Sequence, residues 1–391
     1  MKLFYVYYHD REFVPIHVSE ILHELQKRKH KVTVFTSVRN KKKQLLGVEN
    51  IRLYNIPIPD TRFISELIFM VCLFPFLLIG SLRDRPDAFY CRHSASSSIV
   101  TFIAKLIRKP CLLEVNDINI DKIRFEKVSK LKILWINLYH YLSIRLSKQI
   151  LPVTSEISRW IRVRYYLNKK HVREISNGVN VHRFKPKPKT EARQRYKIPN
   201  ESPVLLSLGS LFPWAGIETV IAAAPKILEI FPETLFLIGS GEEPYLTRLK
   251  KIVNDRKLNK CFRFYGFIHW DEASWFISTA DICIAPFIIK ENRSGICSLR
   301  VLSYLACEKP VIGSDIIGLG DMLEKEGIGK SFPMGDSLAL SEAIIRLIQD
   351  ANKIETMGKK ARKFVIDNYS WENVVCRLEK QFYESISNYN R

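Results

Sequence analysis

Hydrophobic positions follow two alternating periods along most of the chain. Residues 2–8 (KLFYVYY) and 30–36 (HKVTVFT) are rich in β-branched and aromatic side chains, as strands are. Residues 15–29 instead repeat apolar side chains at helical spacing. A strand, a helix and a second strand in that order form the βαβ unit of a parallel sheet. The opening of the chain therefore predicts an α/β fold with a doubly wound sheet.

The same alternation forms two series, which predict two Rossmann-like domains. The first series continues with strands expected at 87–94, 110–117 and 149–155 and helices at 96–107, 129–146 and 155–166. Residues 184–200 contain three prolines and many charges, which is typical of an interdomain linker. The second series has strands expected at 204–210, 234–240, 263–267, 281–287 and 310–314, with helices between them, and ends in an amphipathic helix over 369–386.

Length and composition agree with two soluble domains. The chain has 391 residues, of which 47% are hydrophobic and 26% are charged. The net charge of +21 is unevenly distributed, because residues 1–186 hold 33 Lys and Arg against 15 Asp and Glu, whereas the remainder holds 28 against 25. This asymmetry favours an anionic partner for the N-terminal half.

Basic residues and aromatic residues are interleaved over 119–173, with 13 Lys and Arg against 3 acids. The aromatic residues there are Trp135, Tyr139, Tyr141, Trp160, Tyr165 and Tyr166. This pattern suits an anionic membrane surface. A nucleic-acid footprint would carry similar charge, but no nucleic-acid-binding motif is present. A third interpretation is that the aromatic residues are core and the charges are simply solvated.

The most apolar run covers residues 67–80 and contains Pro75. A bilayer span needs roughly 20 residues, so we expect a core helix or an interfacial helix here. Met1 leads directly into the first strand, so no signal peptide is expected. The eight cysteines form no CxxC pair and no zinc-type cluster, which favours free thiols in a reducing cytosol and no metal. The expected location is cytoplasmic, peripheral at the inner membrane face.

Seven segments resemble motifs of the retaining GT-B glycosyltransferases of the family 4 type (glycosyl transferases group 1), and they occur in the family's order. They are HKVTVFT, ISNGVNVHRFKP, LSLGSLFPWAGIETVIAAAPKI, LFLIGSGEE, FRFYGFI with ADICIAPF, LRVLSYLACEKPVIGSD and YSWENV. The resemblance implies a GT-B fold, with two Rossmann-like domains facing a central cleft. It implies an acceptor-binding domain over 1–185, a nucleotide-sugar-binding domain over 186–370, and a helix over 371–391 that crosses back to the first domain.

The resemblance also implies a donor site for a nucleotide-diphosphate sugar in the second domain, with no metal or other cofactor required. Glycines would let the backbone approach the nucleotide closely. Ser298 is a plausible N-cap of a helix whose free N–H groups and dipole suit a diphosphate. The expected donor contacts are Gly209, Ser210, Gly216, Gly239, Ser240, Gly241, Pro286, Arg293, Gly295, Ser298, Arg300 and Ser303.

Four charged donor contacts of the family pattern are absent from this sequence. Gly295 and Ser303 stand where the family has Glu-x7-Glu, and Ser210 and Ala215 stand where an Arg and a Lys grip the diphosphate. Charge-assisted hydrogen bonds are roughly twice as strong as neutral ones, so we expect a weaker or rebuilt donor site. Replacement charges are available from Arg293 or Arg300 for the diphosphate and from Glu291 for the sugar.

Acceptor contacts and catalysis are expected from the carboxyl ends of the first domain's strands. The candidates are His93 and Asp117, with Asp10 and His17 beside the first loop and Glu291 from the donor loop. The resemblance implies that retaining transfer needs no strong protein base, because the donor phosphate can itself take the acceptor proton. Electrostatic stabilisation of the leaving diphosphate is then expected to carry most of the rate.

The sequence therefore leaves two main functional hypotheses. The first is a hexosyltransferase-type glycosyltransferase of polysaccharide biosynthesis, moving a sugar from a nucleotide sugar to a glycan or lipid-linked acceptor at an anionic membrane surface, with nucleic acid not expected as a partner. The alternative is a catalytically degenerate GT-B protein that acts as a glycan- or partner-binding subunit. A sugar-nucleotide epimerase is a third, less favoured option.

Overall fold

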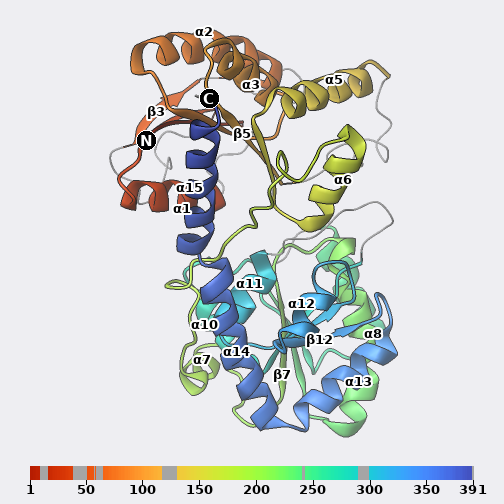
Figure 1. The fold of residues 1–391 in the computed structure, drawn as a ribbon. Coiled ribbons are helices and arrows are strands. Elements are labelled where there is room, and N and C mark those ends of the chain that lie inside the picture. The colour runs from red at the N-terminus through yellow and green to blue at the C-terminus, as the bar shows by residue number, and fades with distance from the viewer. Residues whose placement is uncertain are drawn as a thin grey trace. The chain divides into compact units, whose positions relative to one another are not determined.

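The chain forms two separate α/β units (Figure 1). The computed structural model describes residues 1–8, 16–37, 51–56, 58, 65–116, 130–239, 243–288 and 299–389. Of these, residues 1–177 and 371–389 form the first unit, and residues 178–288 and 299–370 form the second.

The first unit is built on a six-stranded parallel sheet in the order β3-β2-β1-β4-β5-β6. Its strands are β1 (Lys2–Tyr7), β2 (Lys31–Thr36), β3 (Arg52–Asn55), β4 (Ala88–Arg92), β5 (Cys111–Val115) and β6 (Gln149–Pro152). This is the order of a doubly wound sheet, in which the strand order, not the strand direction, reverses between β1 and β4.

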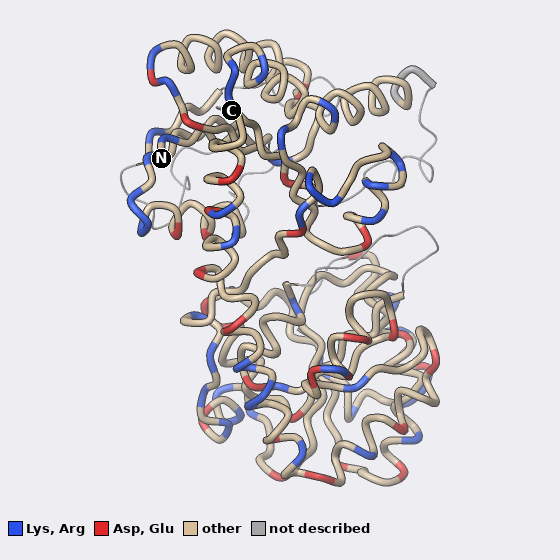
Figure 2. Tube along the Cα trace, viewed as in Figure 1, with Lys and Arg blue, Asp and Glu red and all other residues tan. Residues whose placement is uncertain are grey.

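Two groups of helices cover the two faces of this first sheet. One face packs against α2 (Ser65–Asp84), α3 (Ser97–Leu106), α5 (Lys130–Leu146) and α6 (Ser155–Tyr165). The other face packs against α1 (Ile16–Lys27) and α15 (Trp371–Ser387). Helix α2 has charged residues only at its ends, so Figure 2 shows it uncoloured along most of its length.

Helix α15 comes from the end of the chain and completes the core of the first unit. It buries Trp371, Val374, Val375, Leu378 and Phe382 in one cluster with side chains of the sheet and of α1. Hydrogen bonds add to this packing, since Glu379 accepts one from Arg28 at 3.1 Å and one from the His30 ring at 2.8 Å. The first sheet therefore depends on the chain terminus for one of its two covers.

The second unit repeats the same sheet plan, with strand order β12-β11-β10-β7-β8-β9. Its strands are β7 (Val204–Leu208), β8 (Leu235–Gly239), β9 (Phe262–Phe264), β10 (Ile282–Ala285), β11 (Val311–Ser314) and β12 (Gly329–Phe332). All its strand pairs are parallel. The switch point of this sheet lies between β7 and β10.

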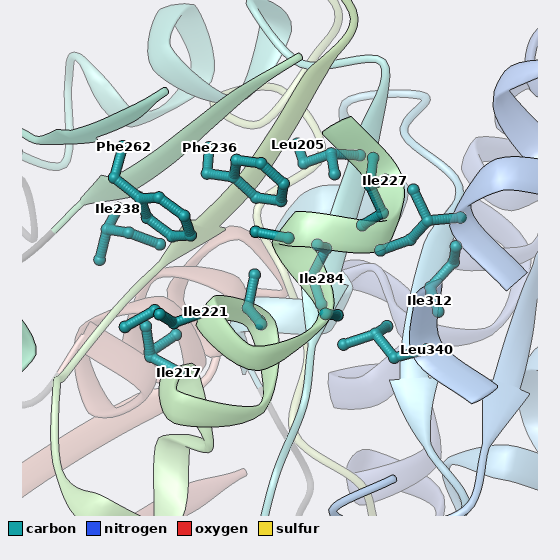
Figure 3. Packing of buried hydrophobic residues seen from close by; sticks show 14 of the residues in the cluster. Leu205, Ile217, Ile221, Ile227, Phe236, Ile238, Phe262, Ile284, Ile312 and Leu340 are labelled. Atoms are coloured by element: carbon teal, nitrogen blue, oxygen red, sulfur yellow. The ribbon is translucent and has the colours of Figure 1, made fainter. Parts of the chain in front are cut away.

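The helices of the second unit are α7 (Lys189–Arg195), the short 3-10 helix η2 (Pro213–Ala215), α8 (Ile217–Ile230), α9 (Tyr245–Asp255), α10 (Ala273–Ser278), α11 (Leu299–Ala306), α12 (Gly320–Lys325), α13 (Ser337–Ile348) and α14 (Ala351–Tyr369). The largest core cluster joins the sheet to α8, α9 and α13 (Figure 3). Every second residue of a strand contributes to this cluster, for example Phe236 and Ile238 in β8 and Ile282 and Ile284 in β10, as the two-residue period of a strand requires.

The α/β fold class with two Rossmann-like sheets is confirmed. The expectation of a linker over residues 184–200 was wrong, because these residues lie inside the second unit and contain α7, which buries Ala192 and Arg193. The helix expected over the apolar run 67–80 is present and buries Phe69, Leu73 and Leu77 in the core, but it extends beyond that run as the 20-residue α2.

Candidate functional site

The carboxyl edge of the second sheet gathers several of the expected donor-site residues. Ligands of doubly wound proteins bind outside the carboxyl ends of the strands, at the switch point. Here Gly209 follows β7 and Pro286 follows β10, the two strands that flank that point. Among the residues that the structure describes at this edge, the topology therefore brings together Gly209, Ser210, Gly216, Pro286 and Arg300.

Two glycines at this edge are required by close approach. Gly216 has a φ of +70°, and a Cβ added there would lie 1.6 Å from the Pro286 carbonyl oxygen. Gly209 has a φ of +137°, and a Cβ there would lie 2.4 Å from Nε of Arg300. A side chain at either position would need a strained backbone and would displace its neighbour. Gly216 thus allows the loop after β7 to lie close to the loop after β10, and Gly209 leaves room for the Arg300 side chain.

Arg300 lies beside Gly209 with a guanidinium that is only partly used. One terminal nitrogen donates to the Ser210 carbonyl at 2.9 Å, and the guanidinium carbon lies 5.5 Å from the centre of the Phe287 ring. The other terminal nitrogen, Nη1, is buried and has no hydrogen-bond partner among the described residues. Burial lowers the pKa of Arg300, yet an arginine remains charged at neutral pH. A cation with an unused donor is thereby fixed at the switch point.

Of the other residues predicted for the donor site, the structure describes Gly239 and Ser303. Gly239 ends β8, and its carbonyl accepts a 3.0 Å hydrogen bond from the Gly209 N–H. The Ser303 hydroxyl donates to the Leu299 carbonyl at 2.9 Å, within its own helix. The remaining predicted donor, acceptor or catalytic residues lie outside the described residues: Asp10, Asp117, Ser240, Gly241, Glu291, Arg293, Gly295 and Ser298.

Tyr304 is a supporting residue of this edge that sequence reasoning missed. Its hydroxyl accepts from the Leu208 N–H at 2.6 Å and donates to the Leu208 carbonyl at 2.8 Å. Both bonds fix the last residue of β7, immediately before Gly209. A buried tyrosine usually finds such a partner, so a Tyr at an apolar position of α11 was the available signal.

His93 lies at the carboxyl end of β4 in the first unit and is almost fully buried. Its ring centre is 4.2 Å from that of His140 and 6.1 Å from that of Tyr139. Neither ring nitrogen of His93 has a hydrogen-bond partner among the described residues. Burial lowers the pKa of His93 to about 4, so the imidazole is neutral at pH 7. It can offer one donor and one acceptor but no charge.

The lowered pKa of His93 predicts an acid-sensitive first unit. In the unfolded chain the imidazole has its ordinary pKa of 6.5, so between pH 6.5 and 4 the unfolded state binds more protons than the folded state. Stability should be constant above pH 6.5 and fall by about 3 kcal/mol as the pH drops to 4. Urea unfolding at several pH values should show that the unfolding free energy of the His93→Gln variant falls less between pH 6.5 and 4 than that of the wild type. The variant His171→Gln, at an exposed position, is the control. An unchanged pH dependence of the unfolding free energy in His93→Gln would contradict the assignment.

A buried polar cluster next to His93 was also missed from the sequence. The carboxylate of Glu114, in β5, accepts hydrogen bonds from the Tyr90 hydroxyl and from the Asn116 side chain. His17, at the start of α1, has its Nε2 3.9 Å from this carboxylate and 3.1 Å from a terminal nitrogen of Arg92. Burial and the nearby Glu114 raise the pKa of Tyr90. A glutamate inside the apolar strand CLLEV was the signal.

Two family models together match most of the chain. Residues 14–183 match the model described as Glycosyltransferase Family 4, and residues 188–364 match that described as Glycosyl transferases group 1. An uncharacterized glycosyltransferase of Methanocaldococcus jannaschii is 25% identical over 369 residues, which cover 92% of this chain and 91% of that protein. The GDP-mannose-dependent alpha-(1-6)-phosphatidylinositol monomannoside mannosyltransferase of Mycobacterium tuberculosis is 26% identical over 206 residues, 51% of this chain and 53% of that protein.

Solved structures share the fold at low sequence identity. The complex of Anabaena HepE with UDP superposes with a TM-score of 0.78 at 16% identity, over 98% of this chain and 100% of that one. Sucrose-phosphate synthase from Thermosynechococcus elongatus gives a TM-score of 0.77 at 18% identity, over 99% and 100% of the two chains.

Proposed function

Because this chain belongs to the GT-B glycosyltransferases of the family 4 type, we propose that it transfers a hexose from a nucleotide-diphosphate sugar to a glycan or lipid-linked acceptor. The donor would bind at the carboxyl edge of the second sheet, and the first unit would supply the acceptor contacts. We further propose that it works in polysaccharide biosynthesis at the cytoplasmic membrane face, without a metal ion. Relatives named for UDP complexes and for GDP-mannose support a nucleotide-sugar donor of this kind.

The observation that carries the proposal is the position of Arg300. The family's diphosphate Arg is replaced by Ser210 here, and the guanidinium of Arg300 reaches the backbone of that same residue. Gly209 leaves the room that this side chain needs. Arg300 thus brings a positive charge from α11 to the place where the sequence lost one. A pyrophosphate contact there would stabilise the charge that develops on the leaving group.

Replacing Arg300 by Ala should weaken binding of a nucleoside diphosphate by about 10- to 100-fold, the size of a lost hydrogen bond to a charged group. Calorimetry with UDP, GDP and ADP would first identify the nucleotide that the wild-type protein binds. Arg300→Lys should retain part of the affinity, because it keeps the charge but loses the fork of donors. Arg346→Ala, an exposed site on α13, is the control. An affinity unchanged in Arg300→Ala would exclude Arg300 from the site.

A second candidate function is supported by the neutral donor positions. Ser210, Ala215 and Ser303 carry no charge, and the Ser303 hydroxyl already bonds within its own helix. A GT-B protein that binds a glycan or a partner without catalysis would tolerate these residues. Transfer of sugar from any nucleotide sugar by the purified protein would eliminate this candidate, and a protein that binds no nucleotide would favour it.

A further inference from the structure

Three helices of the first unit leave an extended apolar surface uncovered. Helices α2, α3 and α5 lie side by side on one face of the first sheet. They hold 13 of the 25 large hydrophobic side chains that are exposed among the described residues. These 13 residues, here called the apolar face, are Leu67, Val71, Phe76, Ile79, Leu82, Phe102, Leu106, Ile133, Leu134, Trp135, Leu138, Tyr141 and Leu142. Soluble proteins rarely expose so many large apolar side chains on neighbouring helices without a partner for them.

Helix α2 is apolar on both of its sides. Its inner side buries Phe69, Leu73 and Leu77 completely in the core of the first unit. Its outer side repeats apolar residues four apart, with Val71 68% exposed and Ile79 64% exposed. A surface helix of a soluble protein normally carries polar residues on its outer side. The outer side of α2 therefore has the composition of a surface that something covers.

The charges around the apolar face are suited to an anionic partner. Helices α3 and α5 contain no Asp or Glu. The two acids of α2 are both engaged: Glu66 accepts the Ala95 N–H at 2.7 Å, and Asp84 is paired with Arg52 and Arg83. Exposed cations border the face at the helix ends, namely Lys105, Arg108 and Arg145. An apolar centre with a cationic border is the composition of a membrane-surface site.

We propose that the apolar face docks onto an anionic lipid bilayer, with α2 lying in the plane of the interface. Helix α2 is long and apolar enough to cross a membrane. Crossing would, however, remove Phe69, Leu73 and Leu77 from the core of the sheet, so the folded first unit requires the helix to lie flat. Its outer side chains then enter the acyl boundary, and the bordering Lys and Arg reach the headgroups. This surface extends the proposed membrane location and does not depend on catalysis.

Vesicle sedimentation of the full-length protein without nucleotide sugar tests the proposal separately from the enzymatic one. The protein should bind vesicles of phosphatidylcholine with phosphatidylglycerol more tightly than phosphatidylcholine alone. Val71→Asp, Ile79→Asp and Leu82→Asp together should reduce binding at least about tenfold, because they place charges in the apolar boundary. The matched control is Ile230→Asp, Phe267→Asp and Leu338→Asp, three exposed apolar sites of the second unit. Circular dichroism checks that both triple variants fold.

Two more measurements locate the contact and its charge dependence. Lys105→Glu, Arg108→Glu and Arg145→Glu should each weaken binding to the anionic vesicles by about fivefold. Trp135, on α5, should be quenched by brominated lipid, and that quenching should disappear in Trp135→Phe. The proposal would be overturned by vesicle binding that is equal in the two triple variants. It would also be overturned if the protein bound no vesicles and instead formed a soluble dimer that the α2 triple variant converts to a monomer. Membrane-bound protein that resists alkaline carbonate extraction would overturn it too, because that behaviour indicates a spanning helix.

Discussion

Replacing Arg193 by Ala is expected to lower the free energy of unfolding of the second unit by about 3–5 kcal/mol, the cost of breaking a buried charge pair. Arg193 is 1% exposed, and its guanidinium is surrounded by acceptors. Nε donates to the Thr279 carbonyl at 3.0 Å, and Nη2 donates to the Asp281 carboxylate at 2.8 Å. Nη1 donates to the carbonyls of Pro199, Asn200 and Ser202.

The cost is large because the substitution leaves several polar groups without a hydrogen-bond partner at once. Asp281 also accepts the Val204 N–H at 2.7 Å, so the pair ties α7 to the start of β7 and to the turn before β10. Without the arginine, the carbonyls of the buried residues Ser202 and Thr279 lose this donor. Urea unfolding followed by circular dichroism measures the change. Arg195→Ala on the same helix is the control, because its pair with Glu272 is solvent-exposed and should contribute at most about 1 kcal/mol. Equal costs for the two substitutions would refute the central role of Arg193.

Gly216→Ala is expected to abolish nucleotide binding and to destabilise the second unit by about 3 kcal/mol or more. The methyl group would lie 1.6 Å from the Pro286 carbonyl oxygen. No rotamer change can relieve this clash, because the Cβ and the carbonyl oxygen are both fixed by the backbone. The loop after β7 would have to move away from the loop after β10, and the Trp214 carbonyl would lose its 2.9 Å hydrogen bond from the Ile288 N–H. The proposed diphosphate site would then be pulled apart.

A control separates the steric clash at Gly216 from backbone strain. Gly327 has a similar φ of +61°, but the nearest atom to an added Cβ is Nζ of Lys360 at 4.0 Å. Gly327→Ala should therefore cost only about 1 kcal/mol and leave nucleotide affinity unchanged. Thermal unfolding with and without the bound nucleoside diphosphate compares the two variants. If Gly216→Ala is as mild as Gly327→Ala, the two loops do not need their close approach.

The sequence was sufficient for the repeating parts of the fold. Buried parallel strands such as KVTVFT and TLFLIGS are apolar and β-branched, and the helices between them repeat every three to four residues, so both sheets could be predicted. Gly209 and Gly216 were predicted as donor contacts from the family motif, and that contact stays a prediction. The strand order then places them at the switch point.

What the sequence concealed depends on partners far apart in the chain. Arg193 looked like one more charge in a linker, since its acceptors come from residues 199–202 and 279–281. Glu114 looked like an exception in a strand until Tyr90 and Asn116 were placed beside it. The length of α2 was underestimated because its polar end residues, which include Glu66 and Arg83, belong to the helix although they lie outside the apolar run.

The packing of α15 on the first sheet has a consequence for biosynthesis. Among the described residues, the chain leaves the first unit after residue 177, forms the second unit, and rejoins the first unit at residue 371. While the ribosome is still making residues 178–370, one face of the first sheet lacks the side chains of Trp371, Val374 and Phe382 that later seal it. The nascent N-terminal unit must therefore wait, with that face protected by other means, until the final helix emerges. Expressing the first unit on its own would require a spliced gene that joins residues 371–391 to residues 1–177.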